Sequence, residues 1–582
     1  MFEAPQPISD LYKLLRKLDG QPFKRYRTLL NQSFRQDWFF LRFVHIQGSP
    51  GAFPASVCQL VLKASALGLP GGCLSNSHRR TATGDYLLRA LTRGIATQTR
   101  QNRGAQGSGS FQAPCLPPQV LQRNLVKFCK AAVQIAVHIS LPGGPDNRIL
   151  GEQALCMFDQ ELSGIVQTLQ SSVLPSASLE KHCNVVEDML VLQSRLMQYG
   201  LVAFVGDGSV LPRCSGVSQA PLKEGAVRFR APGELAVEVH FPNAGRARGL
   251  GIRRGVNVLI GGAFHGKSTL LNALAKGVYP HIPGDGREQV VTCPDAVFIS
   301  AEEGRAVNGL DISGFFDNLP GRVDARNFWT RNASGSTSEA AAVIEAVLSG
   351  AKFLLIDEDT SATNFLIKDR YMRQLVPEDC VTPLFDRVRE LHRQWDVSTL
   401  LVVGGSSEYL AVAHHVMAMQ NYEPHSMTEI VRGLALPEPQ EPLKPMTVRD
   451  QRRLGTENFD PTYHAPRLGK TVAARIKPLR LHERILEYGN QKLDLTALCA
   501  LVDPQQVLAV GLALLLARKR FRLASLSPSE LAAALSDLIH REGLDILAPA
   551  DSGFPSLACP RQMEIAAAIN RFKGVRMENT NA

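Results

Sequence analysis

A glycine-rich run that ends in lysine and serine is the first part of this chain whose residue types and spacing could do chemistry. Gly261 to Ser268 reads GGAFHGKS and fits the pattern G-x-x-x-x-G-K-[ST]. Glycines let main-chain N–H groups turn inward around phosphate oxygens, and the following helix presents its N-terminus to the anion. Lys267 is expected to reach the β- and γ-phosphates of a nucleotide, and the Ser268 hydroxyl to ligate Mg²⁺. An ordinary glycine-rich turn is the weaker alternative. The predicted nucleotide-binding residues of this phosphate loop are Gly261, Gly262, Ala263, Phe264, His265, Gly266, Lys267, Ser268 and Thr269.

Two carboxylates that follow an apolar run supply the acidic partner that a phosphate loop needs. Phe353 to Ile356 is apolar, and Asp357 and Glu358 come directly after it. Asp357 is expected to hold Mg²⁺ together with Ser268, and Glu358 to polarise the attacking water. A strand ending in acids is by itself more often structural. Its place behind a phosphate loop favours the functional interpretation.

The segments that must position these residues alternate between strand and helix. Strands are predicted at 235–241, 256–260, 296–300, 352–356 and 399–403, and helices at 267–275, 339–349 and 383–394. Such alternation predicts an α/β core with a parallel sheet covered by helices. His414 and His415 are interpreted as ordinary residues on a helix face.

Changes in composition and in the pattern of charged and apolar residues along the 582 residues predict three domains. Residues 1–222 form a basic α+β domain, and residues 223–436 form the α/β domain with the phosphate loop. The Pro-rich stretch Pro437 to Pro445 opens the third domain, 437–582, which is predicted to be mostly helical at 504–519, 528–540 and 561–572.

Composition argues against several classes of protein. The longest apolar run, Val507 to Ala517, is too short to cross a bilayer, so no membrane segment is expected. The first residues lack the apolar stretch of a secretory signal. The 11 cysteines contain no C-x-x-C pair, which disfavours zinc and a disulfide framework and favours an intracellular protein with reduced thiols.

The net charge of +10 lies in the N-terminal region. Residues 1–105 hold 15 Lys and Arg against 5 Asp and Glu, whereas the rest of the chain is balanced. This asymmetry fits a nucleic-acid partner and fits a solvated basic face about equally well. The candidate RNA contacts are Arg79, Arg80, Arg89, Arg93, Arg100 and Arg103.

Four stretches together resemble the predicted ATPases of the ABC class: GGAFHGKSTLLNAL, GVYPHIPGDGREQVVT, NASGSTSEAA and LLIDEDTSATNF. The resemblance covers most of the chain and is most specific around the phosphate loop. It implies an ABC-type P-loop core, ATP and Mg²⁺ as ligands, and a homodimer. Among its members the chain is most similar to the one associated with mitochondrial RNA editing. That similarity implies RNA and an RNA-processing complex as partners and a mitochondrial location. Without that similarity, a cytoplasmic location is expected.

The resemblance also implies roles for further residues. Ser334, Gly335 and Ser336 take the place of the signature loop, whose serine approaches the γ-phosphate bound by a second protomer. An N-terminal helix cap is the alternative for Ser334, and the segment alone favours it. Glu303, beside Glu302, lies where these relatives have a loop that senses Mg²⁺ and the γ-phosphate. Ser361 to Asn364 lies where they have a loop that passes information between the two nucleotide sites.

The chain departs from its relatives at several positions. Ala263 replaces a glycine, Glu339 a glutamine and Glu303 an aspartate, and Gly404-Gly405-Ser406-Ser407 stands where most ABC proteins carry a histidine. The missing histidine predicts slow turnover.

These residues predict an ATP-hydrolysing ABC-class homodimer that couples its nucleotide state to RNA, with Lys267, Glu358 and the opposite protomer's Ser334 as the catalytic set. A nucleotide-gated nucleic-acid-binding module with little turnover is the alternative. The soluble ATPase subunit of a transporter is a weaker one.

Overall fold

The computed structural model describes residues 5–52, 54–99, 103–170, 172–216, 218–368, 374–376, 379–436, 445–465, 470–473, 476–478, 484–548 and 555–578. The chain divides into two compact units. The first unit is Met1–Glu187 with Gly543–Cys559, and the second is Asp188–Glu542 with Pro560–Ala582.

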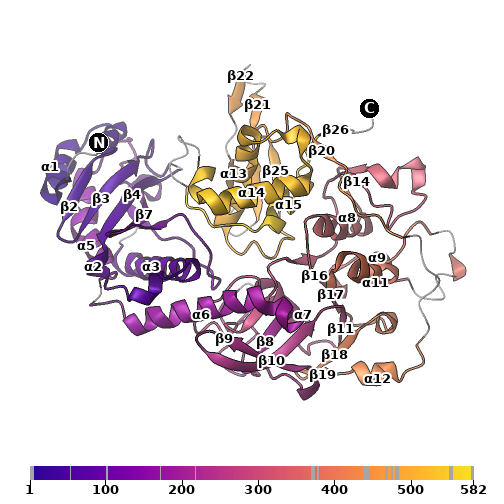
Figure 1. The fold of residues 1–582 in the computed structure, drawn as a ribbon. Helices are drawn as coiled ribbons and strands as arrows, with labels where there is room; N and C mark the ends of the chain where they lie inside the picture. The colour runs from indigo at the N-terminus through magenta and orange to yellow at the C-terminus, as the bar shows by residue number, and fades with distance from the viewer. Residues whose placement is uncertain are drawn as a thin grey trace. The chain divides into compact units, whose positions relative to one another are not determined.

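The first unit is built on a seven-stranded sheet with helices packed around it (Figure 1). Its strands follow the order β1-β2-β3-β4-β7-β5, and β6 also pairs with β7. Their bounds are β1 Gln6–Pro7, β2 Ser33–Gln36, β3 Phe39–His45, β4 Ser56–Lys63, β5 Ser110–Gln112, β6 Val126–Phe128 and β7 Ala132–Ser140. The main helices are α1 Ile8–Leu18, α3 Ser77–Gln98 and α5 Leu162–Gln167. Asn76 caps α3 by accepting from the N–H of Arg79.

The second unit contains a six-stranded sheet in the order β13-β16-β17-β11-β18-β19. The strands are β11 Val256–Ile260, β13 Ala296–Ile299, β16 Phe353–Asp357, β17 Ser398–Val402, β18 His415–Gln420 and β19 Glu423–Ser426. All neighbours are parallel except β18 and β19, which form an antiparallel hairpin. A separate antiparallel sheet has the order β12-β8-β10-β9, with β8 Leu201–Gly206, β9 Ala236–Phe241, β10 Gly245–Arg253 and β12 Val290–Thr292.

Helices cover both faces of the six-stranded sheet. Val258, Leu354 and Leu401 pack in one buried core with α8 (Gly335–Leu348) and α11 (Leu384–Trp395). Helix α7 (Lys267–Lys276) packs against β13, β16 and β17. Strands buried on two faces read as continuous apolar runs, which is why FLLI and TLLV were recognisable as strands in the sequence.

The predicted fold class is confirmed, with three local differences. Helix α8 begins at Gly335, four residues before the predicted start, because Ser334 caps it. The interpretation of His414 and His415 as helix-face residues was wrong: His415 opens β18, and His414 accepts the N–H of Val256 through Nδ1 at 2.9 Å. The hairpin of β18 and β19 was not predicted.

The C-terminal region is helical with short strands. Its helices are α13 Pro504–Arg520, α14 Pro528–Glu542 and α15 Gln562–Arg571, and β23 Ile476–Pro478, β24 Ile485–Tyr488 and β25 Gln491–Asp494 form a small sheet. The domain borders at 222/223 and 436/437 stay predictions. Among the helices of the described residues, none combines the length and the apolar character that a membrane span requires.

Candidate nucleotide-binding site

Parallel pairing brings the ends of three strands to one edge of the sheet. In the registers of β11, β16 and β17, Leu259 and Asp357 both stand level with Val402. The phosphate loop leaves β11, Asp357 ends β16 with Glu358 directly after it, and Gly404 follows β17 at this same edge. Ligands bind at such carboxyl ends in open α/β sheets. The sheet order therefore places the predicted groups together, although they are far apart in sequence.

The phosphate loop turns through backbone conformations that glycine allows. Gly261 has φ +142° and Gly266 has φ +93°, and Gly266 is followed directly by the first residue of α7. The Lys267 ammonium donates to the carbonyl oxygens of Gly261 at 2.6 Å and Gly262 at 2.9 Å, so it lies across the loop that would receive phosphate oxygens. Phe264, at φ +64°, is 94% exposed.

Two oxygen ligands lie side by side where Mg²⁺ is expected. Burial raises the pKa of Asp357, while the Asp359 N–H, the nearby Ser268 hydroxyl and the Lys267 ammonium act in the opposite direction. A carboxylate and a hydroxyl are hard donors of the kind that Mg²⁺ takes alongside phosphate oxygens and water. The pair therefore fits the metal that the fold implies, and Asp357 and Ser268 would hold it.

Glu358 is held by main-chain amides from the loop after β17. Its Oε2 accepts the N–H of Gly405 at 3.0 Å and the N–H of Gly404. These two glycines stand where most ABC proteins carry a histidine. The structure thus gives the predicted water-polarising carboxylate a fixed position beside the phosphate loop.

The signature-like segment forms the exposed start of α8. Ser334 caps this helix: its Oγ accepts the N–H of Thr337 at 3.4 Å. Ser334 is exposed, and Gly335 and Ser336 are partly exposed. The cap and the predicted contact with a second protomer's γ-phosphate are compatible, because a helix N-terminus offers further main-chain N–H groups to an anion.

Of the two glutamates at 302 and 303, the structure leaves one open to solvent. Glu303 is exposed, and its Oε1 lies 3.6 Å from where a Cβ on Gly335 would stand. Glu302 instead pairs with Arg571. Glu303 therefore lies beside the signature-like segment of its own chain, and its predicted contact with the nucleotide stays a prediction.

Helix α8 also carries a buried carboxylate. Glu339 is fully buried, and its Oε2 accepts the N–H of Ala362 at 2.7 Å. Its Oε1 has no hydrogen-bond partner among the described residues. Burial raises the pKa of Glu339 to about 7, against the smaller opposing effects of the hydrogen bond from the Ala362 N–H and of the nearby Ser361 hydroxyl. Glu339 thus links the signature-like helix to the segment at 361–364.

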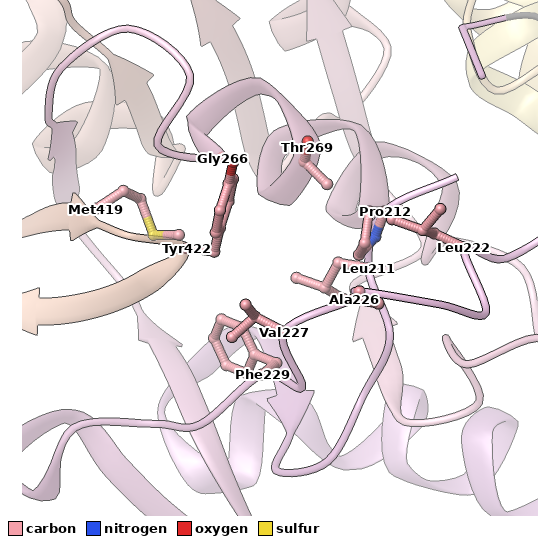
Figure 2. A pocket seen from close by; sticks show the side chains of 11 residues that line it. Leu211, Pro212, Leu222, Ala226, Val227, Phe229, Gly266, Thr269, Met419 and Tyr422 are labelled. Carbon is pink, nitrogen blue, oxygen red and sulfur yellow. The ribbon is translucent and has the colours of Figure 1, made fainter. Parts of the chain in front are cut away.

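An apolar pocket of about 240 Å³ adjoins the phosphate loop, and sequence reasoning missed it. Figure 2 shows Tyr422 and Met419 on one side, with Val227 and Phe229 near them. Its lining residues are Leu211, Pro212, Leu222, Gly225, Ala226, Val227, Phe229, Gly266, Thr269, Met419 and Tyr422. Apolar and aromatic walls next to a phosphate site suit a planar base.

A strained turn places the Tyr422 ring in this pocket. Gln420 pairs with Glu423, so Asn421 and Tyr422 form a two-residue hairpin loop with φ +48° and +70°. Positive φ is uncommon for a bulky residue, and such strain clusters at functional sites. His265 fastens the turn to the phosphate loop, since its Nδ1 accepts the N–H of Asn421 at 2.8 Å.

A buried polar cluster supports the opposite wall. Arg213 Nη2 donates to Asp285 Oδ2 at 2.7 Å, and His281 Nδ1 lies 2.6 Å from the same oxygen. Arg287 Nε donates to the carbonyl of Leu211 at 3.0 Å. The residues of this cluster hold the chain at Leu211, which lines the pocket.

The candidate RNA-binding arginines divide into two groups. Arg79 pairs with Glu187 at 2.8 Å, Arg89 with Asp85 at 2.7 Å, and Arg103 with Glu161. Arg80 and Arg93 are exposed. Arg100 lies outside the described residues.

Comparison with known families yields three matches along the chain. Residues 8–171 match the N-terminal domain of the ATPases of the ABC class, and residues 175–451 match the P-loop domain of the ABC ATPases. Residues 480–578 match the MRB1590 C-terminal domain.

One relative and one solved structure match only part of this chain. The uncharacterized protein MJ1628 of Methanocaldococcus jannaschii is 33% identical over 184 residues, which is 30% of this chain and 41% of that protein. The chain therefore spans less than half the length of this relative. Among solved structures, cbiO1 from Clostridium perfringens, part of the ABC transporter complex cbiONQ, matches 40% of this chain and 92% of its own, at 11% identity and a TM-score of 0.25.

Proposed function

Because this chain belongs to the ATPases of the ABC class, we propose that it binds Mg·ATP at Gly261–Thr269 and hydrolyses it between two copies of the chain. Lys267 would bind the β- and γ-phosphates, Ser268 and Asp357 the metal, and Glu358 would orient the attacking water. One observation carries the proposal: parallel pairing sets Asp357, at the end of β16, level with the end of β11, from which the loop with Lys267 and Ser268 leaves.

The base is proposed to bind in the apolar pocket beside this loop. Gly266 and Thr269 line the pocket and belong to the phosphate loop, so a nucleotide held at the loop can reach it. A Cβ on Gly266 would lie 3.2 Å from Tyr422 Cδ1, which means that the ring packs directly on the loop backbone. Tyr422 would then stack on the base, and Phe229 and Val227 would close the pocket.

The second copy is proposed because, in the proteins that this chain resembles, the signature segment of one protomer completes the nucleotide site of the other. Ser334, Gly335 and Ser336 stand at the exposed start of α8. Two copies placed head to tail would bring each exposed helix start to the other's nucleotide. Phe264 supports this arrangement, since an aromatic side chain that is 94% exposed at the tip of the loop is available for burial against a partner.

ATP-dependent dimerisation tests the proposal. Glu358→Gln should bind ATP without hydrolysing it, and light scattering should show a dimer with Mg·ATP and a monomer without. The matched control is the double variant Lys267→Ala, Glu358→Gln, which keeps the second change but loses the phosphate contact. Equal dimer populations with and without ATP in Glu358→Gln would contradict the proposal.

RNA binding is a second candidate function, favoured by the basic excess in residues 1–105 and by the match to the MRB1590 C-terminal domain. Helix α1, the following turn and β2 carry a group of exposed cations: Lys13, Arg16, Lys17, Lys24, Arg25, Arg27 and Arg35. Together with Arg80 and Arg93, this group offers charge to a phosphate backbone. A mitochondrial location and a partner complex would follow from the same resemblance.

Salt-dependent binding of a labelled single-stranded RNA tests this second function. The triple variant Lys17, Lys24, Arg25→Gln should flatten the plot of log K against log salt by about two to three counterions. The control is Arg518→Gln, which removes a cation of the second unit. Binding that ignores salt, or equal slopes for both variants, would exclude this surface.

A further inference from the structure

An arginine of helix α15, Arg571, contacts the loop that contains Glu303. Arg571, the final residue of α15, donates from Nε to Glu302 Oε2 at 2.9 Å and from Nη2 to Oε1. The two side chains are 7% and 14% exposed. A bidentate, buried pair of this kind fixes orientation as well as distance. The C-terminal region is thereby connected to residues 301–305.

The same loop is fastened to α8 on its other side. The N–H of Glu302 donates to Ser338 Oγ at 2.8 Å, and Arg305 pairs with Glu345 at 2.7 Å. Ser338 and Glu345 both belong to α8, whose first residues form the signature-like segment. The 301–305 loop therefore lies between that helix and Arg571.

Glu302 depends on Arg571 to stay ionised inside the protein. Burial would raise the pKa of Glu302, but the charge and hydrogen bonds of Arg571, together with the charge of Arg305, bring the pKa below its usual value. Without Arg571 the loop would carry an uncompensated buried charge. The loop would have to move or take up a proton, and Glu303 would move with its neighbour.

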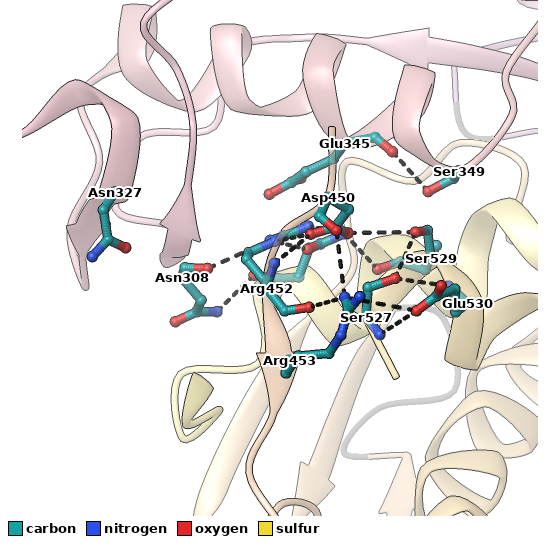
Figure 3. A network of polar contacts seen from close by, with 12 residues as sticks. Asn308, Asn327, Glu345, Ser349, Asp450, Arg452, Arg453, Ser527, Ser529 and Glu530 are labelled. Carbon is teal, nitrogen blue, oxygen red and sulfur yellow. Dashed lines mark hydrogen bonds and ion pairs between the residues drawn. The ribbon is translucent and has the colours of Figure 1, made fainter. Parts of the chain in front are cut away.

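Other contacts hold α15 in place independently of Arg571. Figure 3 shows the buried Arg452 next to Asn308 and Asp450. Arg452 Nη1 also donates to Asn570 Oδ1 at 2.9 Å, and Asn308 Nδ2 donates to the carbonyl of Asn570 at 2.9 Å. At the start of the helix, Arg561 donates to the carbonyl of Pro294 at 2.7 Å. Replacing Arg571 should therefore leave the helix docked.

We propose that Arg571 is a positioning residue of the ATPase: through Glu302 it sets the 301–305 loop, and with it Glu303, for the Mg²⁺ bound to ATP. The C-terminal domain thus forms part of the nucleotide site. This inference rests on the proposed function, because it needs a metal-nucleotide complex at the phosphate loop.

Two measurements on the full chain test the role of Arg571. The first is hydrogen exchange of peptides covering residues 299–306 without nucleotide. Exchange should be faster in Arg571→Ala, intermediate in Arg571→Lys, and unchanged in the control Gln562→Ala. Gln562 lies on the same helix and donates to the carbonyl of Ser349 at 3.1 Å, away from the loop.

The second measurement is the Mg²⁺ concentration that gives half-maximal ATP hydrolysis. It should rise about 10-fold or more in Arg571→Ala, as for other residues that orient a metal site, while the KM for ATP at saturating Mg²⁺ changes little. Unchanged exchange, or faster exchange with an unchanged Mg²⁺ requirement, would overturn the proposal. So would equal effects of Gln562→Ala. Failure of the wild type to bind ATP would instead refute the proposed function, and the exchange result would still decide whether Arg571 positions the loop.

Discussion

Replacing Glu339 by glutamine should make the second unit more stable at neutral and alkaline pH, with little effect in acid. The carboxyl is fully buried, and one of its oxygens has no partner among the described residues. Its pKa is raised from 4.5 to about 7 by burial. A carboxyl whose pKa is higher in the folded state holds its proton there more tightly, so the stability that it contributes is complete below about pH 4.5 and is lost as the pH rises through 7.

The size of the effect follows from the shift. At about 1.4 kcal/mol per pKa unit, ionising Glu339 in the folded state costs about 3 kcal/mol, of which about 2 to 3 kcal/mol should develop between pH 5 and pH 8. A glutamine of the same shape cannot ionise, and its carbonyl oxygen can still accept the N–H of Ala362. For a unit of about 380 residues, with an unfolding entropy of about 2.1 cal/mol/K per residue, the variant should melt about 3 to 4 °C above the wild type at pH 8 and close to it at pH 5.

Tryptophan fluorescence can follow the relevant unit alone. The chain has three tryptophans, of which Trp38 lies in the first unit and Trp329 and Trp395 in the second. Thermal melts in a Trp38→Phe background, from pH 5 to pH 8.5, would report on the second unit. Glu429→Gln, on the exposed surface of α12 (Thr428–Arg432), is the control and should show no pH-dependent difference. A difference in melting temperature between Glu339→Gln and its parent that stays constant across this pH range would refute the reasoning, because Glu339 would then not change its protonation.

Two further predictions concern the nucleotide site. Tyr422→Ala should weaken ATP binding about 5- to 100-fold, the usual effect of losing one aromatic stacking contact with a base, whereas Tyr422→Phe should not. Titration with a fluorescent ATP analogue would measure this, and an equal loss of affinity for inorganic tripolyphosphate would show that the phosphate loop itself had been damaged. Phe264→Ala in the Glu358→Gln background should raise the dissociation constant of the ATP-bound dimer about 10-fold or more, since each copy would lose a buried aromatic side chain. Ile430→Ala, which trims another exposed apolar residue, should leave this constant unchanged in sedimentation, and equal effects of both variants would contradict a role for Phe264 in the dimer.

The groups that could be predicted from sequence are those whose chemistry is carried by neighbours in the chain. Gly261 to Ser268 is a continuous motif, and Asp357 ends an apolar run, so each can be recognised from its neighbours in the sequence. Their meeting also follows from the alternation of strands and helices, because parallel strands end at the same edge. The fold class was accessible for this reason.

Residues that act through distant partners left no such local signal. Tyr422 reaches the phosphate loop through a two-residue hairpin whose Asn-Tyr sequence is not the usual Asn-Gly pattern. Arg571 and Glu302 lie 269 positions apart. The pairing of Arg79 with Glu187 and of Arg103 with Glu161 was equally hidden, whereas Arg89 and Asp85, four residues apart on α3, could have been recognised as a helix pair.

The loop after β17 bears directly on turnover. A histidine side chain can rotate toward a γ-phosphate while the backbone stays in place. The amides of Gly404 and Gly405 cannot, because an N–H group changes direction only when the chain itself moves. Both amides donate to Glu358, so any movement of this loop toward the nucleotide also releases the carboxylate that is expected to orient the water. We therefore expect ordering of the loop and activation of Glu358 to be one event, limited by backbone rearrangement, and we predict for this reason that hydrolysis is slow.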